Sequence, residues 1–406
     1  MKNDYWLTNV RLETGYRYGN SMIIGTETEH FHIRIVDGKV NQIIPANIPL
    51  DTNVPRHDAK HYLMLPAFRD MHIHIDKTYY GGNWRAPTLA TKGIWTRLEE
   101  EETLLRQLLP VVEERAGILI NLLLQSGSTH IRTHCNVDPI IGLNNLETTL
   151  RALETFKDKA SVEIVAFPQH GLLRSDAVSL MREALKTGAS LVGGIDPASI
   201  DNHIEKSLQT VFDLAIEANA DIDIHLHDPG HLGIFTCRRL AALTEEAGWQ
   251  GRVTISHALA LADIATEEVS EVAALLAHHG ISITSSVPLG RTIPIPLLQE
   301  KGVAVSLGDD SIIDHWSPFG KGDSLEKVGT LAERFHLKDE QSLGQALGFI
   351  TGGITPLNQN GEMIWPKAGD DANFVFVDAS CSAEAVARRA QRMAVLYKGK
   401  IVAGAM

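Results

Sequence analysis

The sequence predicts an α/β protein, a (β/α)8 TIM-type barrel with a small composite β-sandwich domain built from both termini. In the middle of the 406-residue chain, eight short apolar runs alternate with segments that carry apolar residues at helical spacing. Towards both ends, apolar and polar residues instead alternate one by one, as in half-buried strands. We therefore expect residues 1–62 and 360–406 to form the β domain and residues 63–359 to form the barrel.

The expected elements follow in the order that a closed barrel requires. The terminal strands are expected at residues 5–12, 31–36, 39–44 and 373–378, with a hairpin over 394–403. The eight barrel strands are expected at 63–75, 129–136, 162–169, 191–196, 221–228, 253–258, 281–288 and 303–310. Helices are expected at 98–125, 176–187, 203–218 and 234–247, among others. Parallel strands need such crossover helices, so eight units predict closure.

The bulk composition excludes several classes of partner. A formal net charge of −13 and a pI near 5.7 argue against nucleic acid, because binding phosphates needs a basic surface. Cys135, Cys237 and Cys381 are odd in number and far apart, which predicts reduced thiols and a cytoplasmic location. No signal peptide or membrane-spanning run is expected. We expect a small-molecule partner, and the sequence does not exclude a homo-oligomer.

The most informative motif is a His-x-His pair at the end of the first barrel strand. His72 and His74 are two residues apart, so alternation in a strand sends both imidazoles to the same side. Two neutral imidazoles that converge form half of a metal site. An isolated His-x-His is more often a hydrogen-bonded pair, so the metal reading needs further ligands at other strand ends.

Further chemical groups do stand at the ends of later barrel strands. They are His225, His227 and Asp228 at strand five, His257 at strand six, and Asp309 and Asp310 at strand eight. Each alone could be a helix cap or a side chain satisfied by a neighbouring carbonyl. Reactive residues of such barrels gather at the carboxyl ends of the strands, and all of these fall there. The pattern therefore predicts one metal-assisted site.

Several motifs resemble the amidohydrolase superfamily, in particular its cytosine deaminase branch. The similar stretches are Leu65-Pro-Ala-Phe-Arg-Asp-Met-His-Ile-His-Ile-Asp76, Ile131-Arg-Thr-His-Cys-Asn-Val-Asp138, Ala166-Phe-Pro-Gln169, Val253-Thr-Ile-Ser-His257 and Asp310-Ser-Ile-Ile-Asp-His-Trp316. Residues 191–197, 225–228 and 318–323 are similar to isopropylammelide aminohydrolase, which removes an alkylamine from a triazine ring. The resemblance covers nearly the whole chain.

The resemblance implies a single divalent metal ion. Its ligands would be His72, His74, His225 and Asp310, the last chosen over Asp309 by its spacing to Trp316. Relatives with two metals carry a bridging lysine at the end of strand four, and residues 193–197 contain none. Zn²⁺ is favoured and Fe²⁺ is an alternative, because His and carboxylate ligands suit both.

The resemblance also implies roles in catalysis and substrate binding. The catalytic residues would be His257, Asp310 and Asp228; the substrate would meet Gln169, His227, Ser311 and Trp316. His227 is the alternative to Asp228 as donor to the ring nitrogen. Ser311 replaces a family aspartate and Asp228 a family glutamate, which disfavours unmodified cytosine.

The expected activity is metal-dependent hydrolytic deamination of a small amino-substituted heterocycle, either cytosine-like, 5-methylcytosine-like or N-alkylaminotriazine-like. A cyclic amidase that opens a ring lactam or imide, and a barrel that binds without turnover, are the alternatives. Three further segments have structural expectations. The acidic run 99–102 is expected to be a solvated helix start. Asp76 and Lys77 are expected to form an ion pair at the pocket rim, and residues 81–87 are expected to form a loop over the site.

Overall fold

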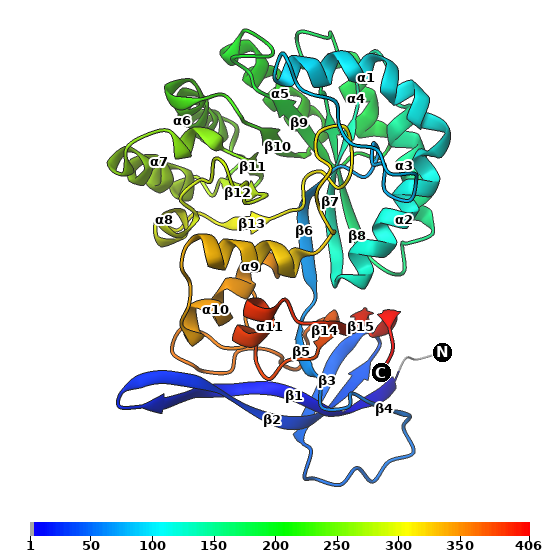
Figure 1. Ribbon diagram of the computed structural model, residues 1–406, viewed down its shortest axis with the longest axis vertical. Coiled ribbons are helices and arrows are strands. Elements are labelled where there is room, and N and C mark those ends of the chain that lie inside the picture. Colours follow the sequence, from blue (N-terminus) through cyan, green and yellow to red (C-terminus); the bar gives the residue numbers. More distant parts are fainter. Residues whose placement is uncertain (1–3) are drawn as a thin grey trace.

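The computed structural model describes residues 4–406, which form two eight-stranded sheets with helices around one of them (Figure 1). The parallel sheet has the order β13-β12-β11-β10-β9-β8-β7-β6. Its strands are β6 (Phe68–Ile73), β7 (Ser128–Asn136), β8 (Ser161–Phe167), β9 (Leu191–Ile195), β10 (Asp221–His225), β11 (Val253–Ser256), β12 (Ser282–Ser285) and β13 (Val305–Leu307). The sheet is all-parallel and buried, as helices on its outer face require.

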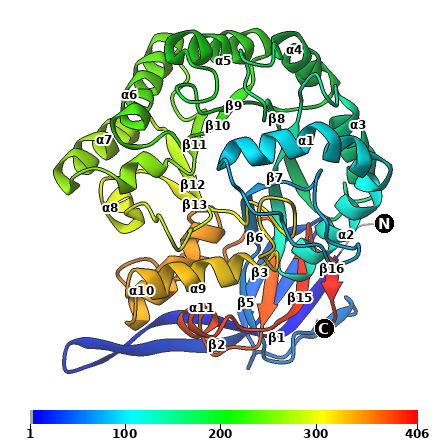
Figure 2. The same ribbon diagram turned by 45° about the horizontal axis from the view of Figure 1, so that its top comes forward.

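The two edge strands of this sheet meet just beyond β13. Ile73 and Asp310 form a parallel bridge, in which the amide of Asp310 donates to the carbonyl of His72 over 2.7 Å. The amide of His74 donates in turn to the carbonyl of Asp310 over 3.0 Å. The ring of helices around the strands is visible in Figure 2. The predicted TIM-type barrel is confirmed, and its closure places His72, His74 and Asp310 side by side.

The helices follow the barrel strands in the chain, except that the last one lies between two strands of the second sheet. They are α1 (Ile94–Leu108), α2 (Val112–Gln125), α3 (Asn144–Glu154), α4 (Val178–Thr187), α5 (Ile204–Ala218), α6 (Gly230–Ala247), α7 (Thr266–His278), α8 (Ile295–Glu300), α9 (Ser324–Arg334), α10 (Glu340–Ala346) and α11 (Ser382–Arg388). The segment expected as one helix over 98–125 is two helices joined by a short 3₁₀ turn, Leu109–Val111. Pro110 explains the break, because it has no N–H for the helical ladder.

The second sheet joins the two ends of the chain. It contains β1 (Asp4–Gly19), β2 (Met22–Val36), β3 (Lys39–Pro45), β4 (Arg56–Asp58), β5 (Leu63–Pro66), β14 (Phe374–Val377), β15 (Arg392–Tyr397) and β16 (Lys400–Gly404). The order β16-β15-β14-β5-β1-β2-β3, with β4 on β1, mixes strands from both termini. The composite β domain expected from the sequence is thus present, including its last hairpin.

One strand expectation was wrong. Residues 63–75 were expected to be a single barrel strand, but β5 pairs antiparallel with β14 in the terminal sheet, and the barrel strand begins at Phe68. Side chains of this apolar run pack into two different hydrophobic cores. Leu63 and Leu65 face one side of the terminal sheet, and Met64 faces the other. The division between domains at residues 62/63 and 359/360 stays a prediction.

Two further observations concern the whole described chain. Within residues 4–406, no helix combines the length and the apolar character needed to cross a membrane. Cys135, Cys237 and Cys381 are all buried as free thiols, as their spacing in the sequence predicted.

Candidate active site

A cavity of about 660 Å³ opens at the carboxyl ends of the barrel strands. The residues around it include His74, Lys77, Gln169, His225, His227, His257, Asp310, Ser311 and Trp316. These residues come from both halves of the barrel. They include every predicted substrate contact, whereas Asp228 is absent from the lining. The volume lies in the range typical of small-molecule sites.

The four predicted metal ligands converge at the base of this cavity. Nε2 of His72 lies 3.4 Å from Oδ1 of Asp310, and Nε2 of His74 lies 3.7 Å from the same oxygen. Nε2 of His225 lies 3.4 Å from Nε2 of His74. His225 is held in place by Phe167, whose ring stacks on the imidazole at 4.1 Å. Asp309, the rejected alternative ligand, turns instead towards Lys327 at 3.9 Å.

Hydrogen bonds fix which nitrogen of His72 and His74 faces the cluster. Nδ1 of His74 lies 3.1 Å from the carbonyl of His134, which can only accept, so Nδ1 carries the proton. Ser256 gives its single hydroxyl proton to Asp223 over 2.6 Å and therefore accepts from Nδ1 of His72 over 2.8 Å. Each Nε2 is left with a bare lone pair, as a metal ligand must be.

The charge state of the cluster also suits a cation. Burial lowers the pKa of His74 and His225 well below the usual value, and the neighbouring imidazoles lower it further. Burial alone would raise the pKa of Asp310, but His257 and His72 outweigh it and hold that pKa well below its usual range. Neutral imidazoles and an ionised carboxylate are the ligand forms that bind a divalent metal.

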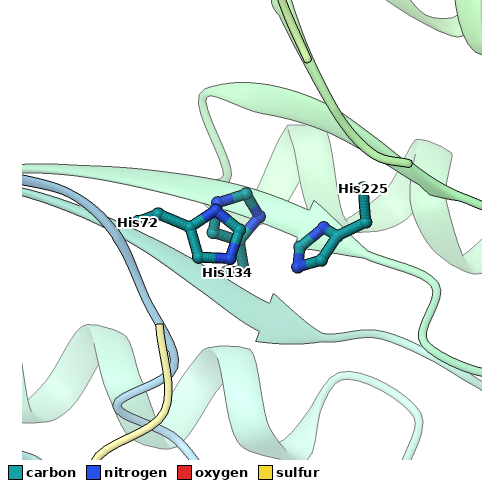
Figure 3. A group of neighbouring side chains, drawn as sticks. All are labelled: His72, His134 and His225. Carbon is teal, nitrogen blue, oxygen red and sulfur yellow. The ribbon is translucent and has the colours of Figure 1, made fainter. Parts of the chain in front are cut away.

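His134 on β7 is a member of the cluster that the sequence reasoning missed. Its ring lies 4.0 Å from that of His72, and ligand atoms of His72, His134 and His225 lie within 4.8 Å of one another (Figure 3). Both of its ring nitrogens are buried without a hydrogen-bond partner. Alternation along β7 could have indicated it, since the strand turns every second side chain inward. His134 is thus a further candidate ligand.

His257 and His227 form one side of the cavity. Their rings lie 4.5 Å apart, and Nε2 of His257 is buried without a hydrogen-bond partner. Burial lowers the pKa of His257 well below its usual value, with His227 adding to the effect. The backbone of His257 and Asp310 is left-handed, with φ of 72° and 66°. Such conformations in non-glycine residues cluster at functional sites.

Asp228 does not line the cavity as the sequence suggested, and Asp196 is the acid beside His227. The Asp228 carboxylate accepts from the amides of Ala198 and Ser199 over 3.0 and 3.1 Å, so it holds the loop after β9. Asp196, which the sequence reasoning did not single out, contacts Nδ1 of His227 through Oδ2 at 2.9 Å. The residue in the cavity is therefore His227, oriented by Asp196.

Gln169 and Lys77 both line the cavity and contact each other. The ammonium of Lys77 donates to Oε1 of Gln169 over 2.7 Å, which settles the orientation of the amide because Lys has only donors. The expected Asp76–Lys77 ion pair at the rim was wrong. Both residues are buried, the Lys77 ion pair is with Glu101 at 3.2 Å, and Asp76 accepts from Asn136 and Asn145.

The acidic run 99–102 lies inside α1, which begins at Ile94, so it is not the solvated helix start that was expected. Glu101 is fully buried, whereas Glu99 and Glu102 are exposed. The indole Nε1 of Trp316 donates to Glu101 over 3.1 Å, so Trp316 both walls the cavity and fixes this carboxylate. Residues 81–87 do not line the cavity; Ile94 of α1 does.

Comparison with known proteins places the chain in a family. Residues 57–403 match the amidohydrolase family. The chain is 45% identical over 405 residues to protein YahJ of Escherichia coli (strain K12), described as uncharacterized, covering 99% of this chain and 88% of that one. It is 33% identical over 352 residues to N-isopropylammelide isopropyl amidohydrolase of Pseudomonas sp. (strain ADP), covering 85% and 87%.

Solved structures agree with this placement. The fold is similar to N-isopropylammelide isopropylaminohydrolase from Burkholderia multivorans, with a TM-score of 0.86, 29% identity and coverage of 99% and 98% of the two chains. It is also similar to 5-methylcytosine deaminase from Klebsiella pneumoniae, with a TM-score of 0.79, 25% identity and the same coverage. The chain belongs to the amidohydrolase family and is a hydrolase that acts on carbon–nitrogen bonds other than peptide bonds.

Proposed function

We propose that the protein is a metal-dependent hydrolytic deaminase of a small amino-substituted nitrogen heterocycle, with an N-alkylaminotriazine-like ring as the first candidate. The proposal rests on one observation. The four side chains expected to bind a metal converge at a cavity that Gln169 also lines, with its amide oriented by Lys77. Cytosine-like and 5-methylcytosine-like rings are the other candidates. The named relatives act on an isopropylammelide and on 5-methylcytosine.

The donor set fits one divalent metal ion. Nε2 of His72 is buried with no hydrogen-bond partner, and the bare Nε2 of His74 faces Nε2 of His225 at 3.4 Å. A divalent cation would take the bare lone pair of His74, and the tautomer of His225 with its proton on Nδ1 would offer a second lone pair beside it. Three imidazoles and a carboxylate suit Zn²⁺ and also Fe²⁺. A bound divalent cation lowers the pKa of its water from about 15.7 to about 7.

The residues around the expected metal position have different roles in the reaction. Asp310 is ionised and in contact with the cavity, so it accepts the proton that water loses. His257, beside Asp310, stabilises oxygen charge that develops on the attacked carbon. His227, oriented by Asp196, donates to the ring nitrogen next to that carbon. In the overall reaction the ring carbon gains the oxygen of water and the C–N bond breaks. The amine leaves with the proton that Asp310 took from water, and the second proton of water replaces the one that His227 gave to the ring nitrogen.

Asp228 is not assigned the ring-nitrogen proton in this proposal. Its two carboxylate oxygens already accept amide protons from residues 198 and 199, and it does not line the cavity. Ser311, Trp316 and Gln169 contact the substrate in this proposal. Gln169 offers its amide N–H groups, because Lys77 occupies one lone pair of its oxygen.

A substrate screen with metal analysis tests the proposal. Metal per chain is measured first, and the loaded enzyme is then given N-isopropylaminotriazines, cytosine, 5-methylcytosine and a cyclic imide. Release of ammonia or an alkylamine with an intact ring supports deamination. Ring opening without amine release identifies the cyclic amidase instead. Absence of turnover with full metal would identify a binding barrel.

A further inference from the structure

Glu101 of α1 is the centre of a buried polar cluster at the wall of the cavity. Nζ of Lys77, Nε2 of His315 and Nε1 of Trp316 lie 3.2, 2.8 and 3.1 Å from its Oε1. Its Oε2 accepts from Nδ2 of Asn136 over 3.2 Å, and Nε2 of His170 lies at the same distance. One carboxylate thus gathers five groups from the loops that follow strands β6, β8 and β13 and from the end of β7.

The burial of this cluster requires the carboxylate to be ionised and paired. Glu101 is fully buried and Lys77 is 1% exposed. A buried ammonium without a counter-charge would lose its proton or the position of its side chain. Asp76 and Asp314 are nearby acids, but neither forms an ion pair with Lys77 within 4.0 Å among the described residues. The charge of Lys77 therefore depends chiefly on Glu101.

Lys77 links this cluster to the cavity. Its ammonium contacts Glu101 on one side and Oε1 of Gln169 on the other, at 2.7 Å. It also lies 5.7 Å from the ring of Trp316. Glu101 therefore positions two groups that line the cavity. It accepts a hydrogen bond from the indole of Trp316 directly, and it holds the amide of Gln169 through Lys77.

We propose that Glu101 is a positioning residue for substrate recognition. Through Lys77 it turns the N–H groups of Gln169 towards the cavity, and through its other contacts it holds α1 as part of the wall. The wall then offers donors, so the substrate edge that it recognises carries acceptors, a ring carbonyl or an unprotonated ring nitrogen. This inference rests on the proposed function for the identity of the ring, but its claim about α1 stands apart from turnover.

A double-mutant cycle tests the route through Lys77. Glu101→Gln and Lys77→Met are each expected to lower kcat/KM about tenfold, mainly by raising KM, because hydrogen bonds to the ring are lost on binding. The double variant is expected to lose less than the product of the two single losses, since the two side chains share the contact that orients Gln169. Additive losses, or an effect on kcat alone, would overturn the proposal. Glu102→Gln, an exposed neighbour on the same helix, is the matched control and keeps the wild-type constants.

Hydrogen–deuterium exchange tests, without a substrate, whether Glu101 holds α1 against the barrel. Residues 94–108 are expected to exchange faster in Glu101→Gln than in wild type or Glu102→Gln, with the barrel strands unchanged. Unchanged exchange in α1 would overturn the anchoring role. If the wild-type enzyme releases no amine from any ring, the proposed function fails, whereas this exchange measurement still decides whether Glu101 holds the wall. If Glu101→Gln unfolds globally, exchange will be faster in every strand. The exchange of residues 94–108 is then measured in Lys77→Met instead.

Discussion

Oδ2 of Asp196 lies 2.9 Å from Nδ1 of His227, and Oδ1 of the same carboxylate accepts hydrogen bonds from the backbone amides of His227 and Asp228. Burial lowers the pKa of His227, but Asp196 and then Asp310 outweigh burial, so the net pKa is raised. The imidazolium therefore persists to a higher pH than for a free histidine. This is the property needed by a proton donor at neutral pH.

Replacement of this carboxylate tests the assignment of the proton donor. In Asp196→Asn the pKa of His227 is expected to fall, so the alkaline limb of the kcat/KM profile moves to lower pH. The pH dependence of kcat/KM with an amine-releasing substrate measures the shift. Asp263→Asn, at a carboxylate that contacts Arg291 outside the cavity, is the control with an unchanged profile. An alkaline limb that stays in place in Asp196→Asn would refute His227 as the donor.

Asp228 is expected to matter for stability rather than for the chemical step. Asp228→Ala removes the acceptor of two amides in the loop after β9, so the free energy of unfolding should fall by about 1–2 kcal/mol. Denaturant unfolding measures the loss, and the pH profile of kcat/KM should keep both of its limbs. A general acid contributes about 10²- to 10⁴-fold, so a loss of that size without destabilisation would return the role to Asp228.

His257 is expected to act on the reaction and not on metal retention. His257→Asn should keep its metal, because the four converging ligands are elsewhere, and should lose about 10²- to 10³-fold in kcat through lost charge stabilisation. Metal analysis and steady-state kinetics on the same preparation separate the two effects. Loss of the metal with the rate would instead make His257 a ligand.

Ser256 is expected to influence metal affinity through the tautomer of His72. Ser256→Ala leaves Nδ1 of His72 without its acceptor and Asp223 without one donor, so affinity should fall about 10- to 100-fold. Competition with a chelator measures the affinity. Ser282→Ala, whose hydroxyl lies 2.9 Å from that of Thr254 on the neighbouring strand, is the matched control. Equal affinities for the two variants would contradict the tautomer argument.

The sequence could predict the barrel and most of its cavity because strand alternation determines direction. His72 and His74 lie on one side of a strand for that reason, and the position of Asp310 at the end of the last strand follows from barrel closure. The same rule indicates His134 on β7, although that residue was not among the expected metal ligands.

Other features depend on packing that no local pattern contains. Glu99, Glu101 and Glu102 are identical residues in one run, and only the rotation of α1 against the barrel buries Glu101. Asp196 follows β9 directly and Asp228 lies shortly after β10. Only the path of the loop after β9 decides which carboxylate contacts His227. The sequence of residues 63–75 likewise does not show where the strand of the terminal sheet ends and the barrel strand begins, because a buried strand of either sheet is an apolar run.

The proposed chemistry depends on three imidazoles and one carboxylate that together hold a single metal ion. A crystal structure of the metal-loaded enzyme, with anomalous diffraction recorded at the absorption edge of the bound metal, tests it most directly. We expect one peak per chain, bonded to Nε2 of His72, His74 and His225 and to the carboxylate of Asp310, at about 2.0–2.2 Å. A peak held by His134 in place of His74 and Asp310, or a peak outside the barrel mouth, would contradict it.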